Sequence, residues 1–149
     1  MIPAWASERI AREVDEYLAH ATIDMSDDPL TPIACRLRAW PVYGDIGGAL
    51  MLDAGGTVFC CDNNTLEVRP ETNRGWQLLA LVIASRRIPE LRALLPPRSA
   101  ASSDCSACNG TGQVEVGPGC QLWCGVCWGL GWRREDVAIP DTAPDCGDK

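Results

Sequence analysis

Four cysteines in the last third of the chain form two pairs, each with two residues between its members. The pairs belong to one repeated pattern, Cys-x-x-Cys-x-Gly-x-Gly, which occurs as CSACNGTG at residues 105–112 and as CGVCWGLG at residues 124–131. A Cys-x-x-Cys turn can direct two thiolates at one metal ion, and structural zinc prefers four tetrahedral ligands, which leave no position for a catalytic water. The pattern therefore predicts one structural Zn²⁺ ion bound by Cys105, Cys108, Cys124 and Cys127.

The rest of the repeated segment has residues that suit this site. Its glycines can adopt positive φ at little cost, which lets the chain turn tightly around the metal at Gly110, Gly112, Gly129 and Gly131. Between the repeats, QVEV and CQLW flank the turn sequence GPG and predict a β-hairpin over residues 113–123. The hairpin would return the chain, so that each repeat supplies half of the site.

The same cysteine pairs could instead be redox-active or have no role. A redox Cys-x-x-Cys usually lies at the N-terminus of a helix that follows a strand, whereas the glycines here disfavour a helix. The chain has nine cysteines, which cannot all pair with one another, and in a reducing compartment cysteine pairs indicate metal ligands. Of the others, we expect Cys35 and one of Cys60 and Cys61 in the core, Cys120 as a spare thiol and Cys146 on the tail.

The elements that must position this site suggest an α+β body followed by a small module. Ile10, Val14 and Leu18 recur at helical spacing and predict a helix over residues 7–23, with Ser7 as its N-cap. Alternating or short apolar segments predict an antiparallel β-meander, and two more apolar segments predict helices that follow it in the chain. The strands are expected at 33–40, 48–53, 57–62 and 65–69, and the helices at 73–87 and 89–95.

A change of composition separates the body from the cysteine-rich segment. The stretch PPRSAASSD has the composition of a linker, and the end of the chain is polar with prolines and a glycine, which is typical of a loose tail. We therefore expect an α+β domain at 1–95, a linker at 96–104, a four-cysteine zinc module at 105–134 and a flexible tail at 135–149.

Charge and hydropathy limit the class of partner. The formal net charge is −7, whereas proteins that bind nucleic acid usually present a basic face. No stretch approaches 18 consecutive apolar residues, and the N-terminus lacks the basic and apolar regions of a secretory signal. We therefore expect a cytoplasmic protein whose partner is another protein, and neither a nucleic acid nor a membrane.

The chain shows no combination of residues typical of catalysis. Neither a Ser-His-Asp, a Cys-His nor a phosphate-loop pattern is present, and the one histidine, His20, lies near a predicted helix C-terminus, where its charge suits the helix dipole. We therefore predict no catalytic residue. Trp123, Trp128 and Trp132 cluster around the second cysteine pair, where they could cover a small module or form a partner-binding patch.

The two copies of Cys-x-x-Cys-x-Gly-x-Gly resemble the cysteine-rich zinc repeats of DnaJ-type chaperones over residues 105–131. That family has four repeats and two zinc ions, whereas two repeats here suffice for one ion. The family's J domain carries a His-Pro-Asp motif, but Ala21 follows His20, so stimulation of a heat-shock ATPase is not implied. The resemblance implies binding of unfolded polypeptides through the zinc module.

A second resemblance concerns the body of the protein. The run YGDIGGALMLDAGGTVFCCD at residues 43–62, followed by a helix, is similar to the core of SUKH-type domains over residues 40–95. These are α+β proteins, many of them bacterial immunity proteins that act against polymorphic toxins. The resemblance implies binding of one cognate protein and no catalysis.

The residues and the resemblances together predict a non-catalytic, zinc-binding protein that interacts with another protein, in an immunity-like or adaptor role. The alternative is a co-chaperone-like protein that binds unfolded polypeptides through its DnaJ-type zinc module. A zinc-dependent enzyme or thiol oxidoreductase is a third hypothesis, and it would require a reactive cysteine of low pKa in one of the two pairs.

Overall fold

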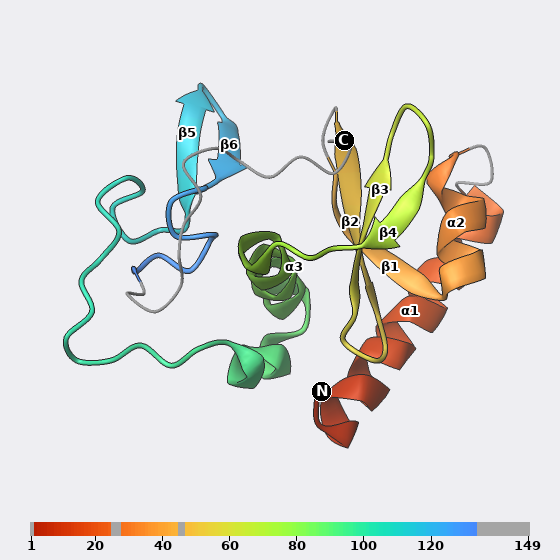
Figure 1. Cartoon of the computed structure of the whole chain (residues 1–149), viewed down its shortest axis with the longest axis horizontal. Helices are drawn as coiled ribbons and strands as arrows, with labels where there is room; N and C mark the ends of the chain where they lie inside the picture. The colour runs from red at the N-terminus through yellow and green to blue at the C-terminus, as the bar shows by residue number, and fades with distance from the viewer. Residues whose placement is uncertain (1, 25–27, 45–46, 134–149) are drawn as a thin grey trace. The chain divides into compact units, whose positions relative to one another are not determined.

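The chain folds as two compact units. The computed structural model describes residues 2–24, 28–44 and 47–133. Among the described residues, those up to Glu71 form the first unit and residues 72–133 belong to the second (Figure 1). The first unit contains N-terminal helices and a four-stranded antiparallel sheet, and the second contains a two-stranded hairpin. The α+β class predicted from the sequence is confirmed.

The sheet of the first unit is a simple meander in the order β1-β2-β3-β4. Its strands are β1 (Ala39–Gly44), β2 (Gly48–Asp53), β3 (Val58–Asp62) and β4 (Val68–Pro70). Each strand pairs antiparallel with the next, and Leu50 of β2 lies opposite Cys60 of β3. All residues of β2 from Gly48 to Leu52 are buried, as expected for a central strand of almost entirely apolar sequence.

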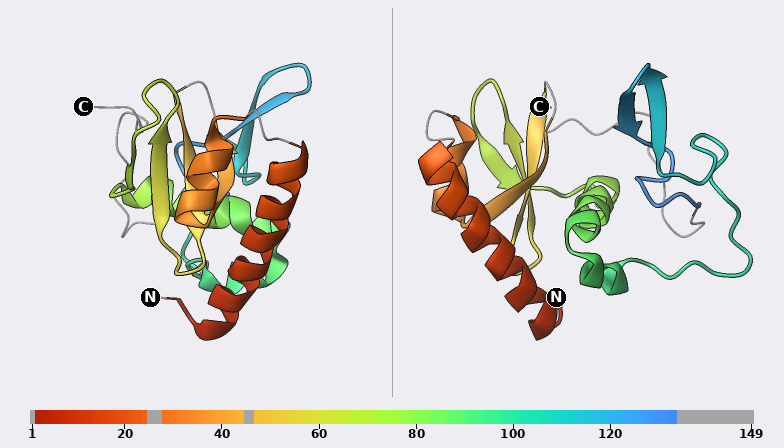
Figure 2. Two further views of the ribbon diagram at one scale, coloured as in Figure 1. Left: turned by 90° about the vertical axis from the view of Figure 1, so that its right-hand side faces the viewer. Right: turned by 180° about the vertical axis from the view of Figure 1, so that it is seen from behind.

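Two helices pack on one face of this sheet (Figure 2). They are α1 (Ala4–Asp24) and α2 (Leu30–Leu37). Ala49 and Met51, two residues apart on β2, point to the same face and lie in one apolar cluster with Ile33 of α2. Tyr17 and Leu18 of α1 pack against the same cluster. No helix in the described residues is both long and apolar enough to span a membrane.

Residues 33–40 form a helix and then a strand, and the prediction of one strand was wrong. Ile33 and Leu37 suit an alternating pattern, but with Leu30 and Ala34 they also recur at i, i+3, i+4 and i+7, which is one helix face. α2 ends at Arg38, whose left-handed backbone (φ 50°) lets its N–H donate to the carbonyl of Ala34. The meander therefore begins at Ala39, and its first strand is β1.

The ends of α1 and of β2 show how side chains define local structure. α1 begins at Ala4, so Ser7 lies inside the helix and is not its N-cap; its hydroxyl donates instead to the carbonyl of Ala54 in the turn between β2 and β3. Asp53 accepts from the backbone N–H groups of Gly55 and Thr57, both at 2.9 Å. This carboxylate organises its own turn, as expected for an Asp at a strand end.

The second unit starts with a helix and ends with the cysteine-rich segment. α3 (Arg74–Arg87) begins after Asn73, whose side chain accepts from the N–H groups of Gly75 at 2.8 Å and Trp76 at 3.3 Å. A short 3-10 helix, η1 (Pro89–Leu94), follows. After an irregular stretch, β5 (Gln113–Gly117) and β6 (Cys120–Trp123) form the predicted hairpin.

The division between the two compact units falls before α3, so α3 and η1 belong to the same unit as the cysteines. The domains expected at 1–95, 96–104 and 105–134 stay a prediction. The physical reason is contact: residues of the second repeat pack directly on α3. A linker composition at 96–104 says only that this stretch has no packed face of its own. The expected tail at 135–149 lies outside the described residues.

Candidate metal centre

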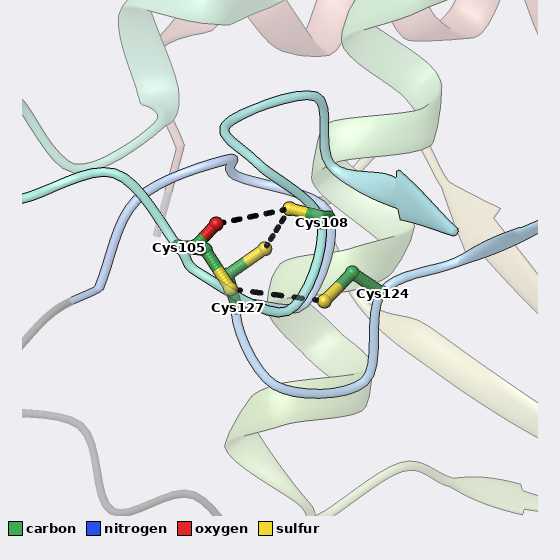
Figure 3. A group of neighbouring side chains, drawn as sticks. All are labelled: Cys105, Cys108, Cys124 and Cys127. Carbon is green, nitrogen blue, oxygen red and sulfur yellow. Dashed lines mark hydrogen bonds between the residues drawn. The ribbon is translucent and has the colours of Figure 1, made fainter. Parts of the chain in front are cut away.

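The four predicted ligands come together in one buried cluster. Their sulfur atoms all lie within 4.8 Å of one another, and the side chains could hold a metal ion. The Sγ–Sγ distances across the two repeats are 3.9 Å for Cys105 and Cys124 and 3.7 Å for Cys108 and Cys127 (Figure 3). None of the four residues is more than 5% exposed. Each repeat therefore contributes two of the four thiols in this cluster.

Two reciprocal backbone hydrogen bonds join the repeats. The N–H of Cys105, the first cysteine of its repeat, donates to the carbonyl of Gly131, the last glycine of the other repeat, at 2.9 Å. The N–H of Cys124 donates to the carbonyl of Gly112, also at 2.9 Å. The two halves thus hold each other by equivalent contacts, as two copies of one motif do when they face each other across a local two-fold axis.

The last glycine of each repeat also stabilises a ligand. The N–H of Gly112 donates to the sulfur of Cys108 and the N–H of Gly131 donates to the sulfur of Cys127, both at 3.2 Å. Such hydrogen bonds favour the thiolate over the thiol, and they orient the sulfur within the cluster. The same two residues thus bind the opposite repeat through their carbonyls and their own repeat through their N–H groups.

The two repeats share their backbone conformation as well as their contacts. The residue after the second cysteine has positive φ in both, 56° at Asn109 and 55° at Trp128. The following glycines have φ near 80–90° in both, and a Cβ added at Gly112 would lie 2.4 Å from the carbonyl oxygen of Gly129. At Gly131 it would lie 2.5 Å from the carbonyl oxygen of Gly110. The predicted role of these glycines is confirmed.

The surroundings of Cys108 and Cys127 shift the pKa values of these two thiols in opposite directions. Burial by itself raises the pKa of Cys108, but hydrogen bonds that its sulfur accepts, first from the N–H of Gly112 and then from the Cys127 thiol, outweigh it and lower the pKa to about 7. Burial raises the pKa of Cys127, and the nearby sulfurs of Cys124 and Cys105 raise it further. The two sulfurs lie 3.7 Å apart, so these opposite shifts belong to the pair and not to either thiol alone. Full ionisation of the cluster therefore needs a positive charge at its centre.

The three tryptophans near the second repeat have different surroundings. Trp128 is only 3% exposed, and its ring lies 5.6 Å from that of Trp76 in α3. Trp123 is half-buried under the guanidinium of Arg86, which lies 5.2 Å from the ring centroid. Trp132 is half-buried and forms an isolated bridge with Asp104. The three do not form one exposed patch, and Trp128 in particular is a packing residue.

Among residues 72–133, the exposed large apolar side chains lie instead on the hairpin. Val116 is 58% exposed and Leu122 is 48% exposed. Leu122 pairs across the strands with Val114, which packs against the cysteine cluster. Sequence reasoning missed these residues because it used the strands only to return the chain. The available signal was the alternation of Val114 and Val116 with Glu115, which predicts an apolar face on a hairpin too small to bury it.

The remaining cysteines differ in burial. Cys60 and Cys61 are both buried, and burial raises the pKa of the Cys61 thiol. Cys35, expected in the core, is exposed, because on a helix it does not share the face of Ile33 and Leu37. Cys120 is exposed on the hairpin, outside the cluster, and Cys146 lies outside the described residues.

Comparison with known proteins found no family model, no curated protein and no solved structure that matches this chain. The DnaJ-type and SUKH-type resemblances therefore depend on the quoted motifs alone. What the structure adds is the four-cysteine cluster itself, which is consistent with a zinc-finger-like module.

Replacing one ligand should abolish metal binding. We expect the purified chain to carry one metal ion and Cys105→Ser to carry none, because three sulfurs cannot complete the buried tetrahedral set. The measurement is elemental analysis of the desalted protein. Cys120→Ser is the matched control, since this exposed thiol lies outside the cluster. An unchanged metal content in Cys105→Ser would show that the cluster is not the binding site.

The last glycine of the second repeat should control metal affinity. In Gly131→Ala the new Cβ would lie 2.5 Å from a backbone oxygen at a φ of 91°, so we expect a loss of about 1–2 kcal/mol, a factor of about 5–30 in affinity. Competition with a chelator measures it. Gly125→Ala is the control, because an added Cβ meets nothing within 4 Å there. Equal affinities in the two variants would contradict the prediction.

Proposed function

We propose that this protein is a non-catalytic zinc protein that binds another protein, in an immunity-like or adaptor role. The observation that carries the proposal is the closed set of four buried thiols, whose backbone hydrogen bonds come from the two repeats themselves. Four cysteine ligands fill the coordination sphere of zinc and leave no position at which water or substrate could be activated. The metal then stabilises structure, and the surface around it supplies the function.

Zinc is the metal that fits these ligands best. Sulfurs bound tetrahedrally at about 2.3 Å from zinc lie about 3.8 Å apart, and the two measured cross-repeat distances are 3.9 and 3.7 Å. A tetrahedral set of four thiolates suits zinc or iron. Zinc does not change its oxidation state, so it is the better match for a site with a structural role.

The hairpin is the part of the zinc module that offers a contact surface. Val116 and Leu122, which we call the hairpin patch, are the exposed large apolar side chains among the described residues of the second unit. The hairpin is anchored on the zinc site, because Val114 of β5 packs against the four cysteines. An apolar contact on a rigid two-stranded support is suited to a protein partner.

A co-chaperone-like function is the second candidate, and the same patch favours it. Leu122 faces Val114 across the strands, so no charged side chain lies opposite it. Together with exposed Val116, it could also bind apolar segments of unfolded chains. The two candidates differ in how many proteins they bind, since a cognate partner is one protein and clients are many.

Changing the hairpin patch tests both candidates at once. In the double variant Val116→Ser/Leu122→Ser we expect the zinc content to stay at that of the wild type and partner binding to fall at least tenfold, about 1.4 kcal/mol. The measurement is affinity capture from the native cells with quantitative mass spectrometry, and Gln121→Ser, on the neighbouring exposed position, is the control.

The pattern of captured proteins decides between the candidates. One protein at fixed stoichiometry, lost in the double variant, supports the immunity-like or adaptor role. A spread of unrelated proteins, together with suppressed aggregation of an unrelated client, supports the co-chaperone-like role. Equal capture by wild type and double variant would show that the patch binds neither.

Alkylation separates both candidates from a thiol enzyme. With zinc bound we expect the four cluster cysteines to resist iodoacetamide and to react after a chelator is added, because a coordinated and buried thiolate is a poor nucleophile. Exposed Cys35 serves as the internal positive control. A fast-reacting cluster cysteine in the zinc-loaded protein would favour the oxidoreductase hypothesis instead.

A further inference from the structure

The second repeat packs closely on α3, a helix outside the motif. The first repeat approaches the same helix at Gly112, where an added Cβ would lie 3.4 Å from Nη2 of Arg86. Gly75, Leu79, Val82 and Arg86 recur along α3 at i, i+4, i+7 and i+11, which places them on one face. Each approaches a residue of the second repeat or the residue before it. The equivalent position to Trp128 in the first repeat is Asn109, which is exposed.

The closest of these approaches lies between Trp128 and Gly75. A Cβ added at Gly75 would lie 2.2 Å from Cε2 of Trp128 and 2.7 Å from its Nε1. The indole therefore rests directly on the backbone of α3, and only glycine leaves room for it. The ring is also tilted against that of Trp76, with an interplanar angle of 57°.

Two further contacts continue along the same face of α3. A Cβ added at Gly129 would lie 3.1 Å from Cγ1 of Val82 and 3.3 Å from Cδ1 of Leu79, so the backbone of the repeat lies against these side chains. At the far end, Arg86 stacks on Trp123, an arrangement that is attractive for a cation over an indole ring.

The residues that contact α3 here lie one or two positions along the chain from a cysteine ligand. Trp123 precedes Cys124, and Trp128 and Gly129 follow Cys127. Trp128 also has unfavourable features that the docked state must offset: a left-handed backbone with φ of 55° and an indole N–H that is buried without an acceptor. Both are tolerated only while the turn around Cys127 is held in place.

We propose that the metal controls the docking of α3: zinc bound to the four cysteines fixes the turn that presses Trp128 onto Gly75, and loss of zinc releases the helix. This inference rests on the proposed zinc site and extends it beyond the motif to residues 74–87. Metal binding and docking are then linked, so each strengthens the other by the same factor. A zinc-free chain exposes the stripe of Leu79 and Val82 that the second repeat covers.

Hydrogen exchange of the full chain tests the release. Zinc content is measured first, and exchange is then followed by mass spectrometry with zinc bound and after chelation. We expect peptides from α3 to exchange roughly tenfold faster or more without zinc, and peptides from β2 and β3 in the first unit to be unchanged. Unchanged exchange of α3 after zinc has left would overturn the inference.

Substitution of Gly75 tests the reciprocal effect. Gly75→Ala favours the helix intrinsically, because alanine has the higher helix propensity, but its Cβ displaces Trp128. We expect α3 to exchange faster in the zinc-loaded variant and zinc affinity to fall several-fold relative to Gly117→Ala, where a Cβ meets nothing within 4 Å. Arg86→Gln removes the other end of the contact without a clash and should shift both readings in the same direction.

Zinc content and zinc affinity distinguish a failure of the proposed zinc site from a failure of the docking of α3. A wild-type chain that holds no zinc would overturn the proposed zinc site and the docking with it. A chain that holds zinc with the same affinity in Gly75→Ala and Gly117→Ala would overturn the docking alone and leave the zinc site standing.

Discussion

Crowding four sulfur atoms into one buried cluster is the constraint on which the second unit depends. Thiols at 3.7–3.9 Å either share protons or ionise around a cation, since uncompensated charge in a buried site is costly. The glycines of the repeat serve this constraint, because a side chain at Gly112 or Gly131 would separate the halves. The reciprocal bonds from Cys105 and Cys124 make the arrangement cooperative, since neither half can form its contacts alone.

One repeated motif thereby produces two different surfaces. The backbones of the repeats are equivalent at the metal, with the same sign of φ at Asn109 and Trp128. Their outward side chains are not equivalent: Asn109 is exposed, whereas Trp128 is buried on α3. The symmetric interior forms the cysteine cluster, and the asymmetric exterior packs on α3 mainly through the second repeat. A structural ion can in this way influence a segment that contains no ligand.

The chemistry of the site and the acidic character of the chain favour the same kind of function. A closed thiolate set organises the chain without activating a substrate, and a net charge of −7 opposes binding to a phosphate backbone. Among the described residues of the second unit, the exposed large apolar side chains are Val116 and Leu122 of the small hairpin, which are too few to form a core of their own. A protein partner can bury them, which is the basis of the proposed interaction.

Local signals in the sequence were enough to predict the four clustered cysteines, the glycines, the hairpin and the strands β2 and β3. In each case the spacing of residues along the chain is sufficient, because a Cys-x-x-Cys turn, a tight turn or an apolar strand forms within a few residues. Residues 33–40 were misassigned because their apolar positions suit both a strand and a helix, and only packing against Ala49 and Met51 selects the helix. The roles of Gly75 and Trp128 were decided by tertiary structure. They lie 53 positions apart, and no local pattern states which element a buried helix packs against.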